Sequence, residues 1–353
     1  MTVTIDELPI PETLGAPGGE DFARAIDVGN VVEAITYGTT DLAYEPDEEL
    51  PYYRDPFHPQ RMLVARLNGT VVGAAHYETQ AEDDADTAWI GVNVHPDHQG
   101  QGIGRALADA VEELSRAEGR AKVVVYHGVQ DSTGPQLHPP TGFGSVPADD
   151  RSVRFLLARD YRLEQVERVS RLPLPVPDLA DRLLAAQAAS GPDYALHYWY
   201  GATPERWRAD VAVLGNRMST DAPSAGLEEP EETWTIERVI AADERDAASP
   251  RTRTVAAVEH LPSGHLVGYT VLSVPRQPYR SAAQYATLVL REHRGHRLGM
   301  LLKVANLAHL ERVAPGHPSV TTFNAEENRH MLSVNEALGF VPIASEGAWR
   351  RDL

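Results

Sequence analysis

Hydrophobic and polar residues follow two regular patterns along the first half of the chain. Alternation with a period of two predicts a strand, and apolar residues three or four positions apart predict a helix. The Asn68-Gly69 dipeptide lies between two apolar runs and predicts a tight hairpin. The expected strands are 3–5, 61–67, 70–78, 89–94, 122–127 and 163–172, and the expected helices are 20–37, 105–118 and 152–159.

A similar order of elements returns after a break rich in proline. Pro173, Pro175 and Pro177 interrupt the pattern, and an alanine-rich helix is expected over 178–190. Later strands are expected over 194–200, 252–260, 265–274, 284–290 and 319–323, and helices over 204–218 and 231–246. We therefore predict two tandem copies of one α/β (α+β) domain, each a mostly antiparallel mixed sheet flanked by helices. The predicted boundaries are an N-terminal domain 1–172, a linker and bridging helix 173–190, and a C-terminal domain 191–353.

The strongest internal match joins residues 94–107 to residues 289–302, 195 positions later. Each copy reads as a strand end, a polar bend, a turn with glycines and an apolar helix. In the first copy, Gly102 and Gly104 let a ligand approach the backbone, and the free N–H groups of the first helical turn favour a diphosphate. A P-loop and a dinucleotide fingerprint do not fit, because neither the Lys-Ser/Thr pair nor the last glycine spacing is present. An ordinary strand–turn–helix is the alternative.

The first turn matches the pattern [Gln/Arg]-x-x-Gly-x-Gly in full. This stretch resembles motif A of the GNAT superfamily of N-acetyltransferases, of the tandem (two-domain) bacterial type, in which the turn holds the pyrophosphate of acetyl-CoA. The resemblance implies that the pantetheine arm pairs with the preceding strand as an added strand would. The implied coenzyme-binding residues are Val92, Val94, Gln99, Gly100, Gly102, Gly104 and Arg105 in the first copy, and Val289, Arg294, Gly295 and Gly299 in the second, where Arg297 replaces the middle glycine.

The end of the second copy resembles motif B of the same superfamily. Its residues are Asn324, Asn328 and the closing Leu338-Gly339-Phe340. The resemblance implies that Asn328 contacts the pantetheine arm and that Asn324 is a further coenzyme-binding residue, and helix capping explains both asparagines equally well. Asn335 occupies the position of the tyrosine that usually protonates the leaving thiolate. The first copy has no counterpart of Asn328, but its turn is intact, so we expect the first domain to hold the coenzyme more tightly.

Composition narrows the choice of partners. The chain has 353 residues, no cysteine and a formal net charge of −19, which excludes disulfides and a cysteinyl acyl-enzyme. An acidic protein is a poor partner for nucleic acid and suits a cationic small molecule, although acidic surfaces need no such substrate. No apolar run of membrane length and no leader-like start is found, so we expect a cytoplasmic location without membrane association. His293 and His296 form no recognisable metal motif, and the sequence does not indicate the oligomeric state.

We interpret the chain as an acetyl-CoA-dependent N-acetyltransferase that acetylates the primary amine of a small, cationic molecule. Transfer is expected to be direct, within a ternary complex, because no cysteine is present to carry the acetyl group. The alternative is an acyl-CoA-binding pseudoenzyme with a regulatory or interaction role. Candidates for proton transfer, each of which also suits a surface or packing role, are Tyr77, Asp86, Tyr285 and Glu292, and further His76, Asp83, Asp84, Tyr198 and the terminal carboxylate of Leu353.

Overall fold

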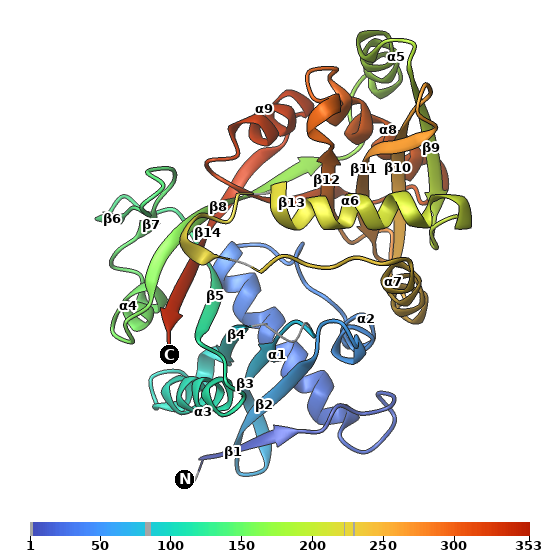
Figure 1. Cartoon of the computed structure of the whole chain (residues 1–353). Coiled ribbons are helices and arrows are strands. Elements are labelled where there is room, and N and C mark those ends of the chain that lie inside the picture. The colour runs from blue at the N-terminus through green and yellow to red at the C-terminus, as the bar shows by residue number, and fades with distance from the viewer. Residues whose placement is uncertain (1–2, 82–85, 222, 229) are drawn as a thin grey trace. The chain divides into compact units, whose positions relative to one another are not determined.

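The computed structural model of the protein describes residues 3–81, 86–221, 223–228 and 230–353. The chain forms two compact units that are not continuous in sequence. Unit 1 comprises Met1–Arg168, Ser224–Pro230 and Ile343–Leu353, and unit 2 comprises Val169–Pro223 and Glu231–Pro342. The expected mixed α/β architecture is confirmed, because each unit combines sheet strands with helices (Figure 1).

The sheet of unit 1 combines an N-terminal meander with a strand from the far end of the chain. β1 (Val3–Leu8), β2 (Gln60–Leu67), β3 (Thr70–Glu78) and β4 (Thr87–Val94) pair antiparallel in sequence order. β5 (Lys122–Val129) joins β4 in parallel, and β14 (Val341–Asp352) pairs antiparallel with β5. The order is therefore β1-β2-β3-β4-β5-β14, followed by the first part of β8 (Arg162–Pro173).

Both faces of this sheet are buried, which explains why β2 is almost continuously apolar. Leu63 and Ala65 lie in a core with α3 (Ile103–Ala117), whereas Met62 and Val64 lie in a second core with α1 (Gly19–Tyr37). Successive strand side chains point to opposite faces, so α1 and α3 cover opposite sides of the sheet. The remaining elements of unit 1 are α2 (Pro46–Glu49), α4 (Arg151–Leu157), β6 (Gln136–Leu137), β7 (Val146–Pro147), η1 (Tyr52–Arg54), η2 (Pro96–His98) and η4 (Ala225–Leu227).

Unit 2 has the same succession of pairings. β9 (Tyr194–Tyr200), β10 (Thr252–His260), β11 (His265–Val274) and β12 (Ala282–Val289) pair antiparallel, and β13 (Ser319–Ala325) joins β12 in parallel. The second part of β8 follows β13. Its helices are α5 (Leu179–Ser190), α6 (Arg208–Asp221), α7 (Ile236–Ala248), α8 (Leu298–Val313) and α9 (Arg329–Leu338), with η3 (Glu205–Trp207) and η5 (Arg291–His293).

Two segments belong to unit 1 although they lie far beyond residue 172 in the sequence. Residues 345–352 of β14 pair with residues 129–122 of β5, position by position. Leu227, in the segment Ser224–Pro230, is fully buried with Val124 and Ala348, and Lys122 Nζ donates a hydrogen bond to the carbonyl oxygen of Glu228 at 2.7 Å. The helix expected to bridge the domains, α5, packs on α8 within unit 2. Whether 1–172 and 191–353 fold as separate domains stays a prediction.

The helix expected over 231–246 begins later than the sequence suggested. α7 starts at Ile236, where the Thr235 hydroxyl accepts a hydrogen bond from the backbone N–H of Arg238 at 3.2 Å. Before it, the side chain of Asn216 accepts from the backbone N–H of Trp234 at 2.7 Å and donates to its carbonyl oxygen at 3.1 Å. Asn216 thus takes up the backbone groups that a longer helix would use.

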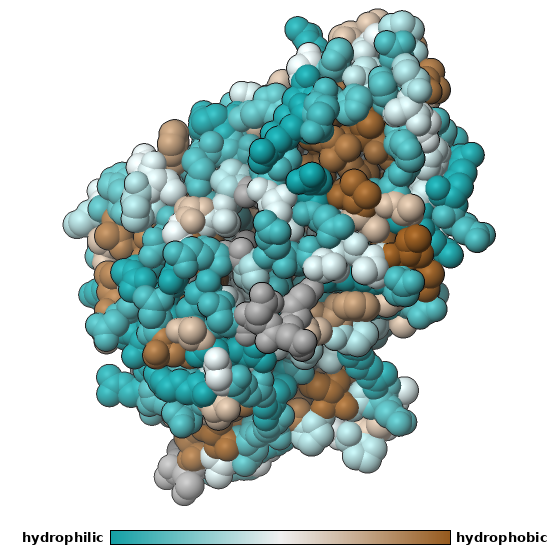
Figure 2. Space-filling model, in the orientation of Figure 1, coloured by the Kyte–Doolittle hydropathy of each residue, from teal (hydrophilic) through white to brown (hydrophobic). Residues whose placement is uncertain are grey.

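The surface agrees with the acidic, polar composition. The face drawn in Figure 2 carries mainly hydrophilic side chains, and its hydrophobic side chains form small separate groups. Within the described ranges, no helix combines the length and the apolar character that a membrane span requires.

Candidate functional site

The central feature of unit 1 is a gap between two strands that begin as neighbours. β4 and β5 pair only from Thr87 to Trp89, opposite Lys122 to Val124. Beyond these residues the two strands separate, and a cavity of about 500 Å³ opens between them. The facing edges of the separated strands therefore offer backbone N–H and C=O groups to a ligand in an extended conformation.

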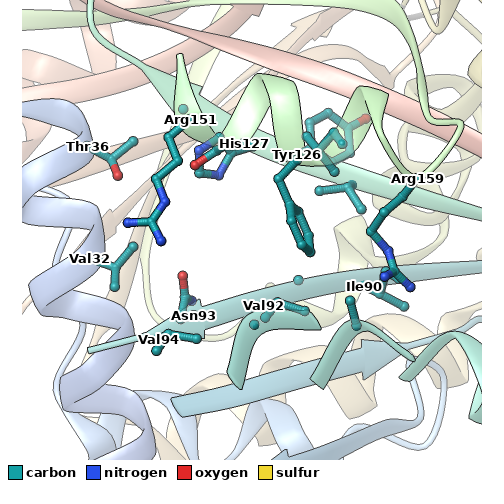
Figure 3. A pocket seen from close by; sticks show the side chains of 18 of the residues that line it. Val32, Thr36, Ile90, Val92, Asn93, Val94, Tyr126, His127, Arg151 and Arg159 are labelled. Atoms are coloured by element: carbon teal, nitrogen blue, oxygen red, sulfur yellow. The ribbon is translucent and has the colours of Figure 1, made fainter. Parts of the chain in front are cut away.

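Residues from helices, strands and the glycine turn of unit 1 line this cavity. Figure 3 shows Val32 and Thr36 of α1, Asn93 of β4 and His127 of β5 around the open space. The lining includes the turn together with Val92 and Val94, whose contact with the coenzyme stays a prediction. Among the lining residues are Val32, Glu33, Thr36, Tyr37, His76, Ile90, Gly91, Val92, Asn93, Val94, Gln99, Gly100, Gly102, Gly104, Arg105, Ala108, Glu112, Tyr126, His127, Gly128, Arg151, Arg159, Tyr161 and Glu346.

The glycine turn lines the cavity and has the backbone shape that an anion site needs. Gly100 and Gly102 have φ angles of 77° and 86°, in the left-handed region that favours glycine. Gly102 precedes α3 and gives the helix no side-chain cap, so the first N–H groups of α3 are available to a ligand. Gln99 braces the turn, because its Nε2 donates to the carbonyl oxygen of Val94 at 3.0 Å.

Arg151 adds positive charge next to this turn. Its Nη1 donates to Oε1 of Gln99 at 2.9 Å, and its guanidinium points into the cavity in Figure 3. It forms no ion pair with a carboxylate of the described chain, so its charge is available to a phosphate. Arg105 is exposed in the first turn of α3 and also lines the cavity. The sequence analysis missed Arg151, since it lies 52 residues from Gln99 and only the fold brings the two together.

Carboxyl groups line the cavity as well. Tyr37 Oη donates a hydrogen bond to Oε1 of Glu346 at 2.5 Å, and Glu33 lies one helical turn before Tyr37. Burial raises the pKa of Glu346 to about 7, while the hydrogen bond from Tyr37 opposes this rise. Burial and the charge of Glu346 raise the pKa of Glu33 to about 7 as well. Burial also lowers the pKa values of His76 and His127, so both imidazoles are neutral at pH 7.

The residues that the sequence suggested for proton transfer lie in different places. Of those in the first copy, His76 lines the cavity, whereas Tyr77 and Asp86 are not among the lining residues. Tyr77 lies in the core, where its hydroxyl donates to Glu118 at 2.8 Å and accepts from Arg120 at 3.1 Å. Asp86 precedes β4 and forms an ion pair with Lys122 at 3.6 Å.

The other candidates are not gathered at this cavity. Asp83 and Asp84 lie outside the described residues. Tyr285 on β12 and Glu292 in η5 are exposed in unit 2, and Tyr198 belongs to β9 of the same unit. Leu353 packs against the core of unit 1. The sequence analysis missed Glu33, Tyr37 and Glu346, none of which belongs to a recognisable motif.

The turn of unit 2 keeps the backbone of the first turn with different side chains. Gly295 has a φ angle of 89°, and Arg297 adopts a φ of 55° in place of Gly102. Arg294 repeats the brace of Gln99, because its Nε donates to the carbonyl oxygen of Val289 at 3.1 Å. In contrast to Gln99, it also forms an ion pair with Asp221 at 2.7 Å, and Gly299 lies in the first turn of α8.

The helix that follows this second turn differs from α3 of unit 1. Lys303 lies six residues after Arg297, just as Ala108 lies six residues after Gly102 in unit 1. Lys303 is buried, its Nζ lies 5.5 Å from the centroid of the Phe340 ring, and burial lowers its pKa to about 7. A long side chain thus occupies a position that in unit 1 is an alanine of the cavity wall.

The two asparagines that resemble motif B make local contacts in unit 2. Asn328 caps α9 by accepting a hydrogen bond from the backbone N–H of Met331 at 3.3 Å. Asn324 accepts from the side chain of Asn335 at 2.6 Å, so the residue in the usual tyrosine position holds the end of β13. Asn328 is therefore a helix cap in the structure. Its contact with a pantetheine arm stays a prediction.

Comparison with known proteins identifies the class. Residues 33–136 match the family model described as Acetyltransferase (GNAT) family. The chain is 34% identical over 132 residues to the L-amino acid N-acyltransferase MnaT of Escherichia coli, covering 35% of this chain and 77% of that protein. It is 29% identical over 326 residues to the mycothiol acetyltransferase of Salinispora arenicola, covering 89% of this chain and 91% of that protein.

The same class describes both units of the fold. A solved tandem GNAT protein from the clavulanic acid biosynthesis pathway superposes with a TM-score of 0.75 and 26% identity, covering 99% of this chain and 98% of that one. The chain belongs to the GNAT family and is an acetyl-CoA-dependent N-acetyltransferase. The predictions of family, tandem fold, enzymatic class and co-substrate are thereby confirmed, and the pseudoenzyme alternative is not supported.

Proposed function

We propose that unit 1 carries the transfer site and acetylates the primary amine of a small molecule that binds as a cation. The observation that carries this proposal is the cavity between β4 and β5, which is lined both by the glycine turn with Arg151 and by the carboxyl groups of Glu33 and Glu346. An anionic coenzyme and a cationic acceptor need these opposite charges within one site.

The residues of unit 1 fit acetyl-CoA. The N–H groups after Gly102 and the guanidinium of Arg151 suit the pyrophosphate, since helix N-termini and arginine both bind phosphate oxygens well. The free edge of β4 from Ile90 to Val94 suits the pantetheine arm, which carries amide groups that can pair with a strand. When bound, acetyl-CoA supplies the thioester whose carbonyl carbon the amine attacks.

The order of events follows from the lack of cysteine. Without a thiol to accept the acetyl group, the simplest route is direct attack by the amine while both substrates are bound. Initial velocities measured against both substrates are therefore expected to give intersecting lines. Parallel lines, or an acetylated protein detected by mass spectrometry during turnover, would contradict direct transfer.

The acceptor itself is best found by measuring thiol release from acetyl-CoA. The amine panel contains polyamines, aminoglycosides and amino acids. It also contains mycothiol without its acetyl group, because relatives of this chain are named for mycothiol and for L-amino acids. Amines that carry a positive charge at pH 7 are expected to give the highest kcat/KM. A preference for neutral or anionic acceptors would contradict a cationic substrate.

Three substitutions test the assignment of the coenzyme to unit 1. Gly102→Asp places a carboxylate beside the pyrophosphate, whereas Gly102→Asn has nearly the same shape, tolerates a positive φ and carries no charge. Calorimetry with acetyl-CoA is expected to show at least a 100-fold loss of affinity for Gly102→Asp and a much smaller loss for Gly102→Asn. Gly299→Asp, in the turn of unit 2, is expected to leave the tight site unchanged. If Gly102→Asp binds as the parent does, the site is elsewhere.

A further inference from the structure

Glu346 lines the cavity although it comes from β14, the last strand of the chain. In the β5–β14 pairing it stands directly opposite Gly128. A Cβ atom on Gly128 would overlap the Tyr37 ring, so the missing side chain makes room for that ring. The Tyr37 hydroxyl then holds Oε1 of Glu346 at 2.5 Å.

Only one oxygen of this carboxyl group is engaged. Oε2 of Glu346 makes no hydrogen bond within the part of the chain that the structure describes. The phenol of Tyr37 fixes the orientation of the carboxyl group, and a group held in this way loses little conformational freedom when it meets a substrate. The free oxygen is therefore a preorganised acceptor for a donor that enters the cavity.

Glu33 is a second acidic group without a partner. It has neither a hydrogen bond nor an ion pair with any described residue, although it lines the cavity beside Val32. Burial of a carboxylate is costly unless a cation or a donor compensates for its lost hydration. Glu33 and Tyr37 are four residues apart on α1 and share one helix face, so Glu33 and Glu346 act on the same part of the cavity.

The surroundings of this pair are acidic rather than basic. Besides Tyr37 and Glu33 on α1, the groups that act electrostatically on the cluster are Glu49 of α2 and Glu167 of β8. Burial and these negative charges keep the pKa of Tyr37 well above its ordinary value, so the phenol stays protonated and cannot be the base. No arginine or lysine neutralises Glu33 or Glu346 among the described residues, which leaves the charge for a ligand.

We infer that Glu346 is the general base of the transfer and that Glu33 binds the same ammonium group, so that the acceptor is a protonated primary amine. This inference rests on the proposed function of unit 1. The ammonium gives one proton to Oε2 of Glu346, which passes it to solvent after the reaction. The nitrogen lone pair forms the C–N bond, the C–S bond breaks with its electron pair on sulfur, and the second proton lost by nitrogen ends on the thiolate.

Isosteric substitutions in the full chain test this inference. Glu346→Gln keeps the acceptor oxygen for Tyr37 but cannot take a proton, so kcat/KM for the amine is expected to fall at least 100-fold. In the parent, protonation of the base is expected to lower activity below pH 7, and this decline is expected to be absent in Glu346→Gln. Glu33→Gln is expected to raise KM for the amine about 10-fold with a smaller effect on kcat. Glu20→Gln, on the exposed surface of α1, is the matched control and is expected to behave like the parent.

Coenzyme affinity separates this inference from the proposed function. Glu346→Gln and Glu33→Gln are expected to bind acetyl-CoA as the parent does and to unfold cooperatively, which shows that the site is intact. If Glu346→Gln retains the kcat/KM and pH profile of the parent while Gly102→Asp abolishes coenzyme binding, only the role of Glu346 is refuted. If Gly102→Asp still binds and turns over, the proposed function of unit 1 fails instead.

Discussion

Tyr37 donates a hydrogen bond to Glu346 at 2.5 Å and so joins the first helix of unit 1 to a strand 309 residues further along the chain. The contact lies in the wall of the cavity between β4 and β5. It links the acceptor chemistry of unit 1 to a residue that follows all of unit 2 in the sequence. Three of the predictions below follow from this contact.

Tyr37→Phe is expected to shift the pH profile of the enzyme. The hydrogen bond from Tyr37 favours the ionised form of Glu346 and so lowers its pKa against the effect of burial. Without the hydroxyl, Glu346 holds its proton to higher pH, so the acidic limb of kcat/KM moves above pH 7. Activity at pH 9 changes less than activity at pH 6.5. An unchanged limb in the pH–rate profile would show that Tyr37 does not act through Glu346.

Gly128→Ala is expected to lower activity by displacing Tyr37. The new methyl group overlaps the Tyr37 ring, which must move away from Glu346. Overpacking of this kind typically costs about 1–3 kcal/mol of stability. The control is the same substitution in a Tyr37→Ala background, where the ring is absent. Urea unfolding and kcat/KM are measured for the parent, both single variants and the double variant, and together they give the coupling between positions 37 and 128. Equal effects of Gly128→Ala with and without the Tyr37 ring would exclude this explanation.

Glu346→Gln is expected to stabilise the fold at high pH. Burial raises the folded-state pKa of Glu346 to about 7, above its ordinary value of 4.5. Protonation therefore stabilises the folded state fully below pH 4.5, and this contribution is lost as the pH rises through about 7. At pH 8 the parent carries a charge on this partly solvated carboxyl group, and the variant does not. The free energy of unfolding of the variant is therefore expected to be higher by about 2 kcal/mol.

Urea unfolding at pH 5 and pH 8 measures this effect. The free energy of unfolding of Glu346→Gln is expected to exceed that of the parent clearly at pH 8 and only slightly at pH 5. Glu20→Gln controls for a general change of charge on the protein. A difference of the same size at both pH values would mean that the gain does not come from removing an ionised carboxyl group.

Arg151→Ala is expected to weaken acetyl-CoA binding about 10-fold, as loss of one charge-assisted hydrogen bond to a phosphate does. The loss is expected to shrink at high salt, because ions screen an exposed guanidinium. Arg154→Ala removes an exposed arginine from the same helix without touching the cavity and serves as the control. Calorimetry at two ionic strengths tests both expectations. Equal affinities of Arg151→Ala and Arg154→Ala for acetyl-CoA would show that Arg151 does not contact the coenzyme.

Local patterns were sufficient for most of the elements and for the backbone shape of the glycine turn. The turn from Gln99 to Gly104 depends on a few consecutive residues, since glycine at a positive φ and a helix start are short-range features. Glu346 shows why the acceptor part could not be predicted. Alternation along β14 indicates which side chains share a face, but it does not say that the neighbouring strand is β5, more than 200 residues earlier.

Proximity in sequence was also a poor guide to the proton acceptor. Tyr77 and Asp86 lie close to β4 along the chain, yet neither lines the cavity. Tyr77 points into the core, where Glu118 and Arg120 satisfy its hydroxyl, because side chains on neighbouring positions of a strand face opposite sides. Its neighbour His76 faces the cavity instead. Alternation along β3 places His76 and Tyr77 on opposite faces of the sheet, but it does not indicate which face borders the cavity.

The position of β14 has a consequence for biosynthesis. A ribosome makes residues 1–168 of unit 1 first, but the strand that carries Glu346 emerges only after the whole of 231–342 has been synthesised. Until then β5 has an open edge, and the nascent chain lacks the side chain we assign to proton removal. Closing so long a loop is slow compared with local folding. With Glu346 as the base, we expect catalytic competence to be acquired only at the end of synthesis.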